Sequence, residues 1–292
     1  MALLLPSAFA LLLWFFATGA VLWLDRQPKE YWPAAVLGAT IASGIAMAAV
    51  IVTAPFSGHL AAYIAFAAGL VLWGWHELTF LMGFVTGPNR APCPADARGW
   101  RRFRLAAAAL IYHEVAMFGT ALAMVAATWG QPNQTATLTF VLLFVMRLSA
   151  KLNIFAGVPH LATEMIPDHM RYLTSYFRVA PARWPFVVSL AGIALIAATL
   201  GQAALAAADG IATGYALAMA LVLLALLEHA FLVVPWRDSQ LFRWAMPRPD
   251  AGGSLPGKTA PSYARASDRF FQQRIDRRHQ GNALAARGIQ SQ

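Results

Sequence analysis

Hydrophobic residues occur along this chain in long blocks, each closed by a short polar break. The blocks lack the alternation, every 2 or 3.6 residues, that gives a soluble strand or helix one polar face, so lipid is the expected surrounding. Seven blocks contain about the 20 residues that an α-helix needs to cross a bilayer. They are Leu3–Leu24, Ala34–Ala54, Leu60–Phe84, Phe103–Thr128, Thr135–Val158, Phe186–Ala207 and Ile211–Val234. The pattern predicts an all-α fold, a polytopic membrane bundle of about seven transmembrane helices.

The basic residues between the blocks predict the orientation of the bundle. Of the 22 Lys and Arg residues, two lie between the first and second blocks, five from Arg90 to Arg104, five from Arg147 to Arg183 and ten after residue 236. The second, fourth and sixth connections carry none. Cytoplasmic connections are enriched in Lys and Arg, so the N-terminus is predicted to be periplasmic and the C-terminus cytoplasmic. The chain is therefore predicted to cross its membrane several times.

Composition supports a membrane protein with one folded domain. The chain is 59% hydrophobic and 12% charged, against roughly 25% charged in an average soluble domain. Residues 1–246 are the predicted seven-helix transmembrane domain, and residues 247–292 are a predicted basic cytoplasmic tail that is mostly disordered. The net charge of +9 comes without a nucleic-acid-binding motif, so nucleic acid is not an expected partner. Because the basic residues lie between the spans, anionic lipid headgroups are the expected partner.

Candidate chemistry is concentrated in pairs of histidine and glutamate. Four of the five Glu residues lie within or at the edge of a hydrophobic block, where a carboxylate costs a few kcal/mol unless it has a partner. Each has a histidine close by in sequence: His76 and Glu77, His113 and Glu114, His160 and Glu164, and Glu228 and His229. A rise of about 1.5 Å per residue from the predicted cytoplasmic ends puts three of the carboxylates roughly 10 to 16 Å deep. The His160 pair reaches this layer only if the fifth helix stops at Pro159 and the chain folds back.

Three interpretations of these pairs stay open. Four His and four Glu converging from several helices suit a two-metal carboxylate site, with iron the favoured metal, although the ferritin-like pattern spaces Glu and His three residues apart and these residues are adjacent. In the second interpretation, Arg147, Lys151 and Asn153 neutralise the glutamates in a buried polar network that holds the helices together. In the third, the histidines are axial ligands to the magnesium of a chlorin or to the iron of a haem.

Two connections on the basic side carry further local signals. Gly87-Pro88-Asn89-Arg90, followed by Pro92-Cys93-Pro94, predicts a stiff turn. The stretch from Arg171 to Phe177 predicts an interfacial helix with aromatic anchors, although a strip that docks a partner is equally compatible. Cys93 is the single cysteine, which excludes an internal disulfide.

Several of these segments together resemble one protein family. They are Trp75-His76-Glu77, Gly87-Pro88-Asn89-Arg90 with Cys93-Pro94, Tyr112-His113-Glu114, Asn153 with Gly157-Val158-Pro159-His160, and Ser175-Tyr176-Phe177. From about the third helix to the seventh, the chain resembles the PuhE family of photosynthetic complex assembly proteins of purple phototrophic bacteria. The resemblance implies a cytoplasmic or intracytoplasmic membrane protein whose partners are reaction-centre and antenna subunits or pigment. It implies no catalytic residues.

The favoured function from the sequence is therefore a membrane assembly factor for the bacterial photosynthetic reaction centre and core antenna, whose His/Glu cluster handles bacteriochlorophyll or a metal. The alternative is a membrane di-metal, di-iron-like oxidoreductase that acts on a lipid-soluble pigment or quinone. A transporter is less favoured, because the outer halves of the predicted spans carry almost no polar residues.

Overall fold

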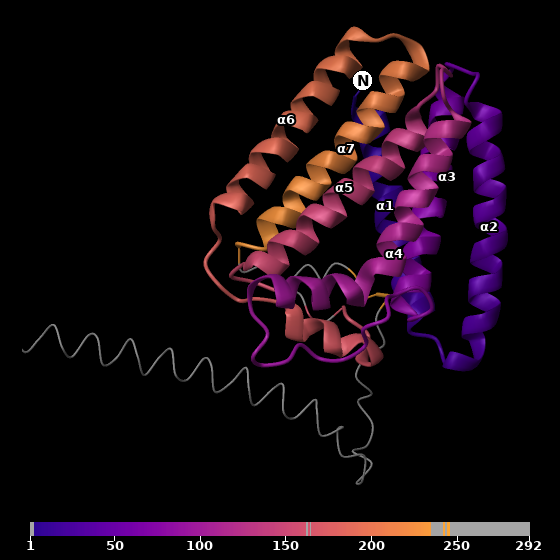
Figure 1. Ribbon diagram of the computed structural model, residues 1–292. Helices are drawn as coiled ribbons and strands as arrows, with labels where there is room; N and C mark the ends of the chain where they lie inside the picture. The colour runs from indigo at the N-terminus through magenta and orange to yellow at the C-terminus, as the bar shows by residue number, and fades with distance from the viewer. Residues whose placement is uncertain (1–2, 162, 164, 235–241, 243, 246–292) are drawn as a thin grey trace, which may run out of the picture. The chain divides into compact units, whose positions relative to one another are not determined.

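The computed structural model describes residues 3–161, 163, 165–234, 242 and 244–245. Its long helices are α1 (Leu4–Asp25), α2 (Trp32–Thr53), α3 (His59–Leu81), α4 (Gly99–Ala127), α5 (Thr135–Ala156), α6 (Trp184–Ala206) and α7 (Asp209–Phe231) (Figure 1). Two 3-10 helices, η1 (Lys29–Tyr31) and η2 (Asp168–Tyr176), lie between them. All seven long helices are long and apolar enough to cross a membrane, which confirms the predicted all-α bundle. The predicted tail, residues 247–292, lies outside the described residues.

Helices α3 and α7 form the centre of the bundle. In the most hydrophobic 18-residue stretch of each helix, 61% of the residues of α3 and 56% of those of α7 are buried, against 11% for α2 and 17% for α6. Figure 1 shows α2 and α6 on opposite outer sides, with α2 packed against α3 and α6 against α7. The apolar side chains that α2 and α6 leave exposed are suited to lipid, because hydrocarbon chains cover such a surface without cost.

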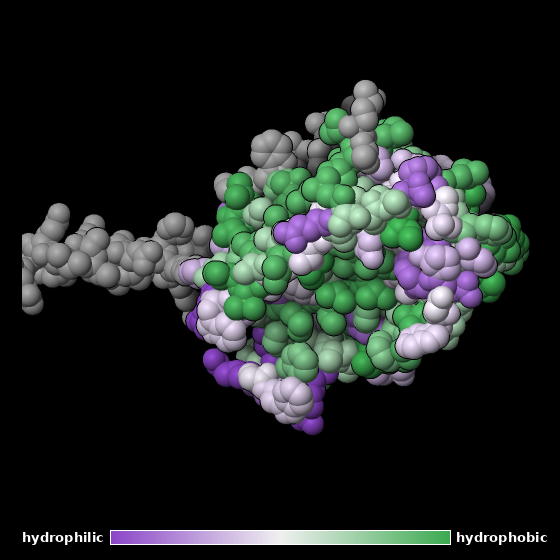
Figure 2. Space-filling view, turned by 90° about the horizontal axis from the view of Figure 1, so that it is seen from above, coloured by the Kyte–Doolittle hydropathy of each residue, from purple (hydrophilic) through white to green (hydrophobic). Residues whose placement is uncertain are grey.

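The helices alternate in direction, so their connections gather at two ends. At the arginine-free end, the Asn133 amide donates to the Ala54 carbonyl (3.0 Å) and the Gly210 amide to the Ser57 carbonyl (3.0 Å). Figure 2 looks down on this end, where small hydrophilic patches lie among hydrophobic side chains. At the other end, called the basic end here, the Trp32 ring centre lies 5.5 Å from that of His169. The periplasmic and cytoplasmic assignment of the two ends stays a prediction.

Helix α4 bends near its middle because another segment of the chain is inserted against its backbone. Figure 1 shows its first half lying across the basic end of the bundle and its second half rising beside α3 and α5. At the bend, the Thr86 carbonyl accepts hydrogen bonds from the amides of Tyr112 (3.0 Å) and His113 (3.1 Å), while the Asn89 amide donates to the Ala108 carbonyl (3.2 Å). Insertion into the helical hydrogen-bond ladder is a known cause of sharp bends.

The bend corrects the predicted depth of Glu114. A straight helix that enters the membrane at Phe103 would put the Glu114 carboxylate about 16 Å from the membrane surface. Its partner Lys151 lies five residues before the end of α5 at Ala156, or about 8 Å along that helix. Glu114 therefore lies closer to the basic end than the sequence indicated, because the first half of α4 runs along that end and not through the membrane.

Candidate functional site

Most of the predicted polar residues that the structure describes lie at contacts between α3, α4, α5 and α7 near the basic end, and α5 is the helix that the others contact. Glu228 lies on α7 beside His229, and it is half-buried. Arg147 and Lys151 are four residues apart on α5, so they share one face. Arg147 Nη2 lies 3.5 Å from Glu77 Oε2 on α3, and Lys151 Nζ lies 2.6 Å from Glu114 Oε1 on α4. These are the charge pairs that the polar-network interpretation expects.

The two ion pairs differ in how far the protein covers their side chains and in the length of the contact. Both partners of the Lys151–Glu114 pair are largely covered, with side chains 21% and 19% exposed. In the other pair, Glu77 is 11% exposed but Arg147 is 47% exposed, and the contact is longer. The Lys151–Glu114 contact is the shorter of the two and its partners are covered by protein on both sides, so it is the stronger link between helices.

His76 and His113 face each other across the interface of α3 and α4, with ring centres 6.4 Å apart. His76 Nε2 lies 2.9 Å from the Thr120 hydroxyl, and its Nδ1 has no partner among the described residues. His113 is 0% exposed, packs with its ring centre 4.5 Å from that of Phe80, and has neither ring nitrogen hydrogen-bonded within the described structure. A buried polar group without a partner costs about 1–3 kcal/mol, so His113 lowers the stability of the fold.

His229 has a different environment, in which both ring nitrogens are satisfied. Its Nδ1 lies 2.8 Å from the Ala225 carbonyl, which can only accept, so Nδ1 carries the proton and Nε2 accepts from the Ser149 hydroxyl at 3.1 Å. Four residues after Ser149 on α5, Asn153 Nδ2 donates to Ser189 Oγ of α6 at 2.9 Å. His229 and Asn153 therefore join α5, α6 and α7.

The predicted break after the fifth helix is confirmed. Helix α5 ends at Ala156, and Gly157 follows with a φ of 126°, a conformation that favours glycine. Val158 then pairs with Val179 in an isolated bridge, and the His160 amide donates to the Leu232 carbonyl at the end of α7 (3.1 Å). The chain thus folds back, and His160 lies near α7. Its predicted partner Glu164 lies outside the described residues.

The metal hypothesis receives no support from this geometry. Among the described residues, no group of three or more His, Cys, Asp or Glu side chains is arranged to hold a metal ion. Glu77 and Glu114 each contact a cation, and His229 uses both nitrogens in hydrogen bonds. The two-metal centre and its eight-residue ligand set therefore stay a prediction.

A second polar assembly, which the sequence showed only as separate segments, joins the connections at the basic end. Asn89 Nδ2 donates to the Tyr176 hydroxyl (2.8 Å), which donates in turn to the Ala91 carbonyl (3.0 Å). Arg102 donates to the carbonyls of Phe155 and Tyr176. Burial raises the pKa of Tyr176 above its usual range, so the hydroxyl stays protonated and can donate. These contacts, called the basic-end clasp here, unite the predicted turn after Gly87, the predicted interfacial segment that ends at Phe177 and the start of α4, which the sequence did not connect.

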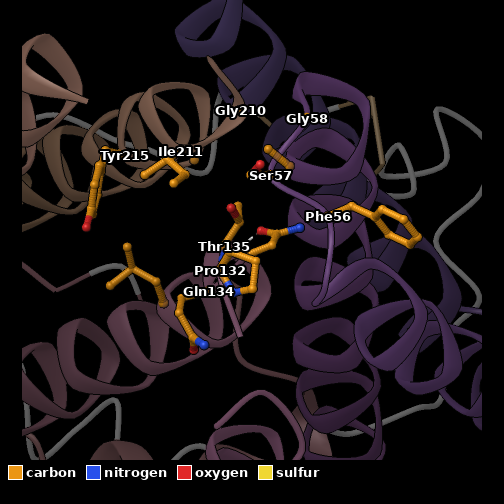
Figure 3. Close-up of a pocket in the computed structure, with 13 residues that line it drawn as sticks. Phe56, Ser57, Gly58, Pro132, Gln134, Thr135, Gly210, Ile211 and Tyr215 are labelled. Atoms are coloured by element: carbon orange, nitrogen blue, oxygen red, sulfur yellow. Dashed lines mark hydrogen bonds between the residues drawn. The ribbon is translucent and has the colours of Figure 1, made fainter. Parts of the chain in front are cut away.

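A small pocket lies at the arginine-free end. Figure 3 shows Ser57, Gly58, Thr135 and Gly210 around it, where the α2–α3 connection meets α5 and α7. Its volume is about 70 Å³, room for about two water molecules at about 30 Å³ each and too little for a tetrapyrrole. The pocket is therefore no candidate pigment site.

Comparison with known proteins adds two findings. A family described as "Protein of unknown function (DUF3623)" matches residues 1–252. A protein of Rhodobacter capsulatus, described as an uncharacterized 30.4 kDa protein in the puhA 5′ region, is 38% identical over 242 residues, which cover 80% of this chain and 87% of that protein. No solved structure matches the chain.

Proposed function

This chain belongs to the family of unknown function DUF3623, and from that membership we propose that it is a membrane assembly factor for the bacterial photosynthetic reaction centre and core antenna. One observation supports the proposal: the 38% identical relative is described as a protein in the puhA 5′ region, and from that position we infer a role with the photosynthetic complexes. The finer proposals are that the family is the one called PuhE, and that the protein works in the cytoplasmic or intracytoplasmic membrane.

The fold suits a factor that holds partners in place more than one that turns over a substrate. The charge pairs on α5 and the basic-end clasp fix the helices and connections against one another near one membrane surface. The unsatisfied imidazole of His113 is the residue best suited to a transient partner, because a ligand could supply the hydrogen bond or metal coordination that the protein does not. Bacteriochlorophyll, whose magnesium accepts an imidazole nitrogen, is the proposed ligand, and because His113 is fully buried, the side chains of α3 and α4 around it must move apart to admit the pigment.

Removal of the gene from a purple phototrophic bacterium that carries it is expected to lower reaction-centre and core-antenna absorbance per unit of membrane several-fold. The full chain supplied on a plasmid should restore it, and messenger RNA for the complex subunits should be unchanged, because the proposed role follows their synthesis. Absorbance spectra of isolated membranes measure the outcome. Wild-type levels of both complexes in the deletion strain contradict the proposal. Accumulation of a modified pigment precursor points to the oxidoreductase alternative.

The His113→Leu protein is expected to be more stable than the wild type and less active in assembly. Leucine removes two buried ring nitrogens that lack partners, each of which costs stability, so the thermal midpoint of the detergent-purified protein should rise by a few degrees. In the complemented deletion strain, the same variant should yield less reaction centre. His229→Leu is the matched control: it breaks two hydrogen bonds and should lower the midpoint. Full assembly with His113→Leu excludes a ligand role for this imidazole.

A further inference from the structure

The first half of α4, residues 99–109 and called the α4 platform here, is positioned to meet the membrane surface. The whole helix has 29 residues and would be about 44 Å long if straight, which exceeds the hydrocarbon thickness of about 30 Å. The part from residue 110 to Ala127 has 18 residues, or about 27 Å, which matches that thickness. The bend therefore leaves the α4 platform outside the hydrocarbon, across the basic end (Figure 1).

One face of the α4 platform is held by the protein. The Arg102 guanidinium lies 4.0 Å from the centre of the Phe155 ring and donates to the Phe155 carbonyl, and the Phe103 and Phe155 ring centres are 5.7 Å apart. Ala109, at the end of the platform, is fully buried. These contacts fix the rotation of the platform about its axis, so its remaining face points away from the bundle.

The outward face is cationic and aromatic. Arg101 and Arg104 are exposed, as is Arg98, the residue that caps the start of the helix, and Trp100 is 67% exposed. Arg101 contacts Asp96, whereas Arg98 and Arg104 have no acidic partner among the described residues. Trp beside Arg at the level of the headgroups is the usual composition of a membrane interface, since indole prefers that layer and guanidinium binds phosphate.

We propose that the outward face of the α4 platform binds anionic phospholipid headgroups, with Arg98 and Arg104 on the phosphates and Trp100 in the interfacial layer. The charge, the depth set by the bend and the fixed rotation all favour this occupant. The inference is independent of the proposed assembly role, because a lipid site of this kind would exist in the isolated protein.

Lipid retention in native mass spectrometry tests the site. Detergent-purified protein should retain phosphatidylglycerol in preference to phosphatidylcholine. Arg104→Gln should weaken the affinity for phosphatidylglycerol about fivefold, because one arginine near an anionic surface contributes about 1 kcal/mol to binding. Arg171→Gln is the matched control, because Arg171 is exposed at the same end but is paired with Asp168. Equal retention of the two lipids, or displacement of the lipid by millimolar inorganic phosphate, overturns the proposal.

Depth measurements test the placement independently of affinity. In a Cys93→Ala background, nitroxide labels at Trp100→Cys and Ala107→Cys should report the same shallow depth by oxygen and nickel accessibility, whereas a label at Phe118→Cys should lie deep. A straight transmembrane α4 would separate the first two labels by about 10 Å of depth. That result overturns the proposal. The proposal is also overturned if the Arg104→Gln protein keeps its lipid but no longer co-purifies with reaction-centre subunits, since the surface would then dock protein.

Discussion

The Gly87→Ala protein is expected to lose most of its folded population. A Cβ at this position would lie 2.2 Å from the Ala108 carbonyl oxygen and 2.7 Å from the Ala109 carbonyl carbon, so backbone must move away from backbone. The movement would pull the Thr86 carbonyl from the amides of Tyr112 and His113. Overpacking by a side chain costs about 1–3 kcal/mol, and the loss of these hydrogen bonds adds to it. Fluorescence-detected size exclusion and thermal midpoints of the purified protein measure the effect.

Gly119→Ala is the matched control for this prediction. Gly119 lies in the second half of the same helix, and a Cβ there would meet nothing within 4 Å. Alanine is favoured over glycine in a helix by roughly 0.5–1 kcal/mol, so this protein should be as stable as the wild type or more so. Equal midpoints for the two variants would show that the inserted segment does not hold the bend in α4.

The Lys151→Met protein is expected to be the least stable of the charge variants. Methionine keeps the bulk of the side chain but leaves Glu114 without its cation near the hydrocarbon layer. Breaking a fully buried pair costs about 3–5 kcal/mol, and the one-fifth exposure of both side chains brings the expected loss to about 2–3 kcal/mol. Arg147→Met should cost less, since the contact of that arginine with Glu77 is longer and therefore weaker.

A double variant separates the charge pair from a metal site. With Glu114→Gln and Lys151→Met together, no charge is left stranded, so most of the stability lost in Lys151→Met should return. Thermal midpoints of the four proteins in the cycle give the coupling. A metal ligand behaves differently: Glu114→Gln alone would reduce bound iron in the purified protein while Lys151→Met would not. An additive cycle together with iron loss in Glu114→Gln rejects the network and restores the metal hypothesis.

The histidine and glutamate pairs illustrate what sequence could and could not establish about the site. Their cost in the hydrocarbon layer indicated that each carboxylate has a partner, and Arg147 and Lys151 are indeed the partners of Glu77 and Glu114. Sequence could not indicate which nitrogen of a histidine is satisfied. His229 and His113 look alike in sequence, but the first bonds both nitrogens and the second bonds neither, because that depends on side chains from other helices.

Sequence by itself determined the seven spans, since a helix in lipid needs about 20 apolar residues and the blocks provide them in order. It also determined that the chain breaks after α5, where Gly157 and Pro159 leave a helix no favourable continuation. Only the tertiary structure decided the bend in α4 and the basic-end clasp. The predicted span Phe103–Thr128 is one uninterrupted apolar block in the sequence. The bend in α4 comes from the Thr86 and Asn89 backbone, which forms hydrogen bonds with residues about 20 or more positions away. Such contacts depend on three-dimensional proximity, which no local pattern of apolar and polar residues encodes.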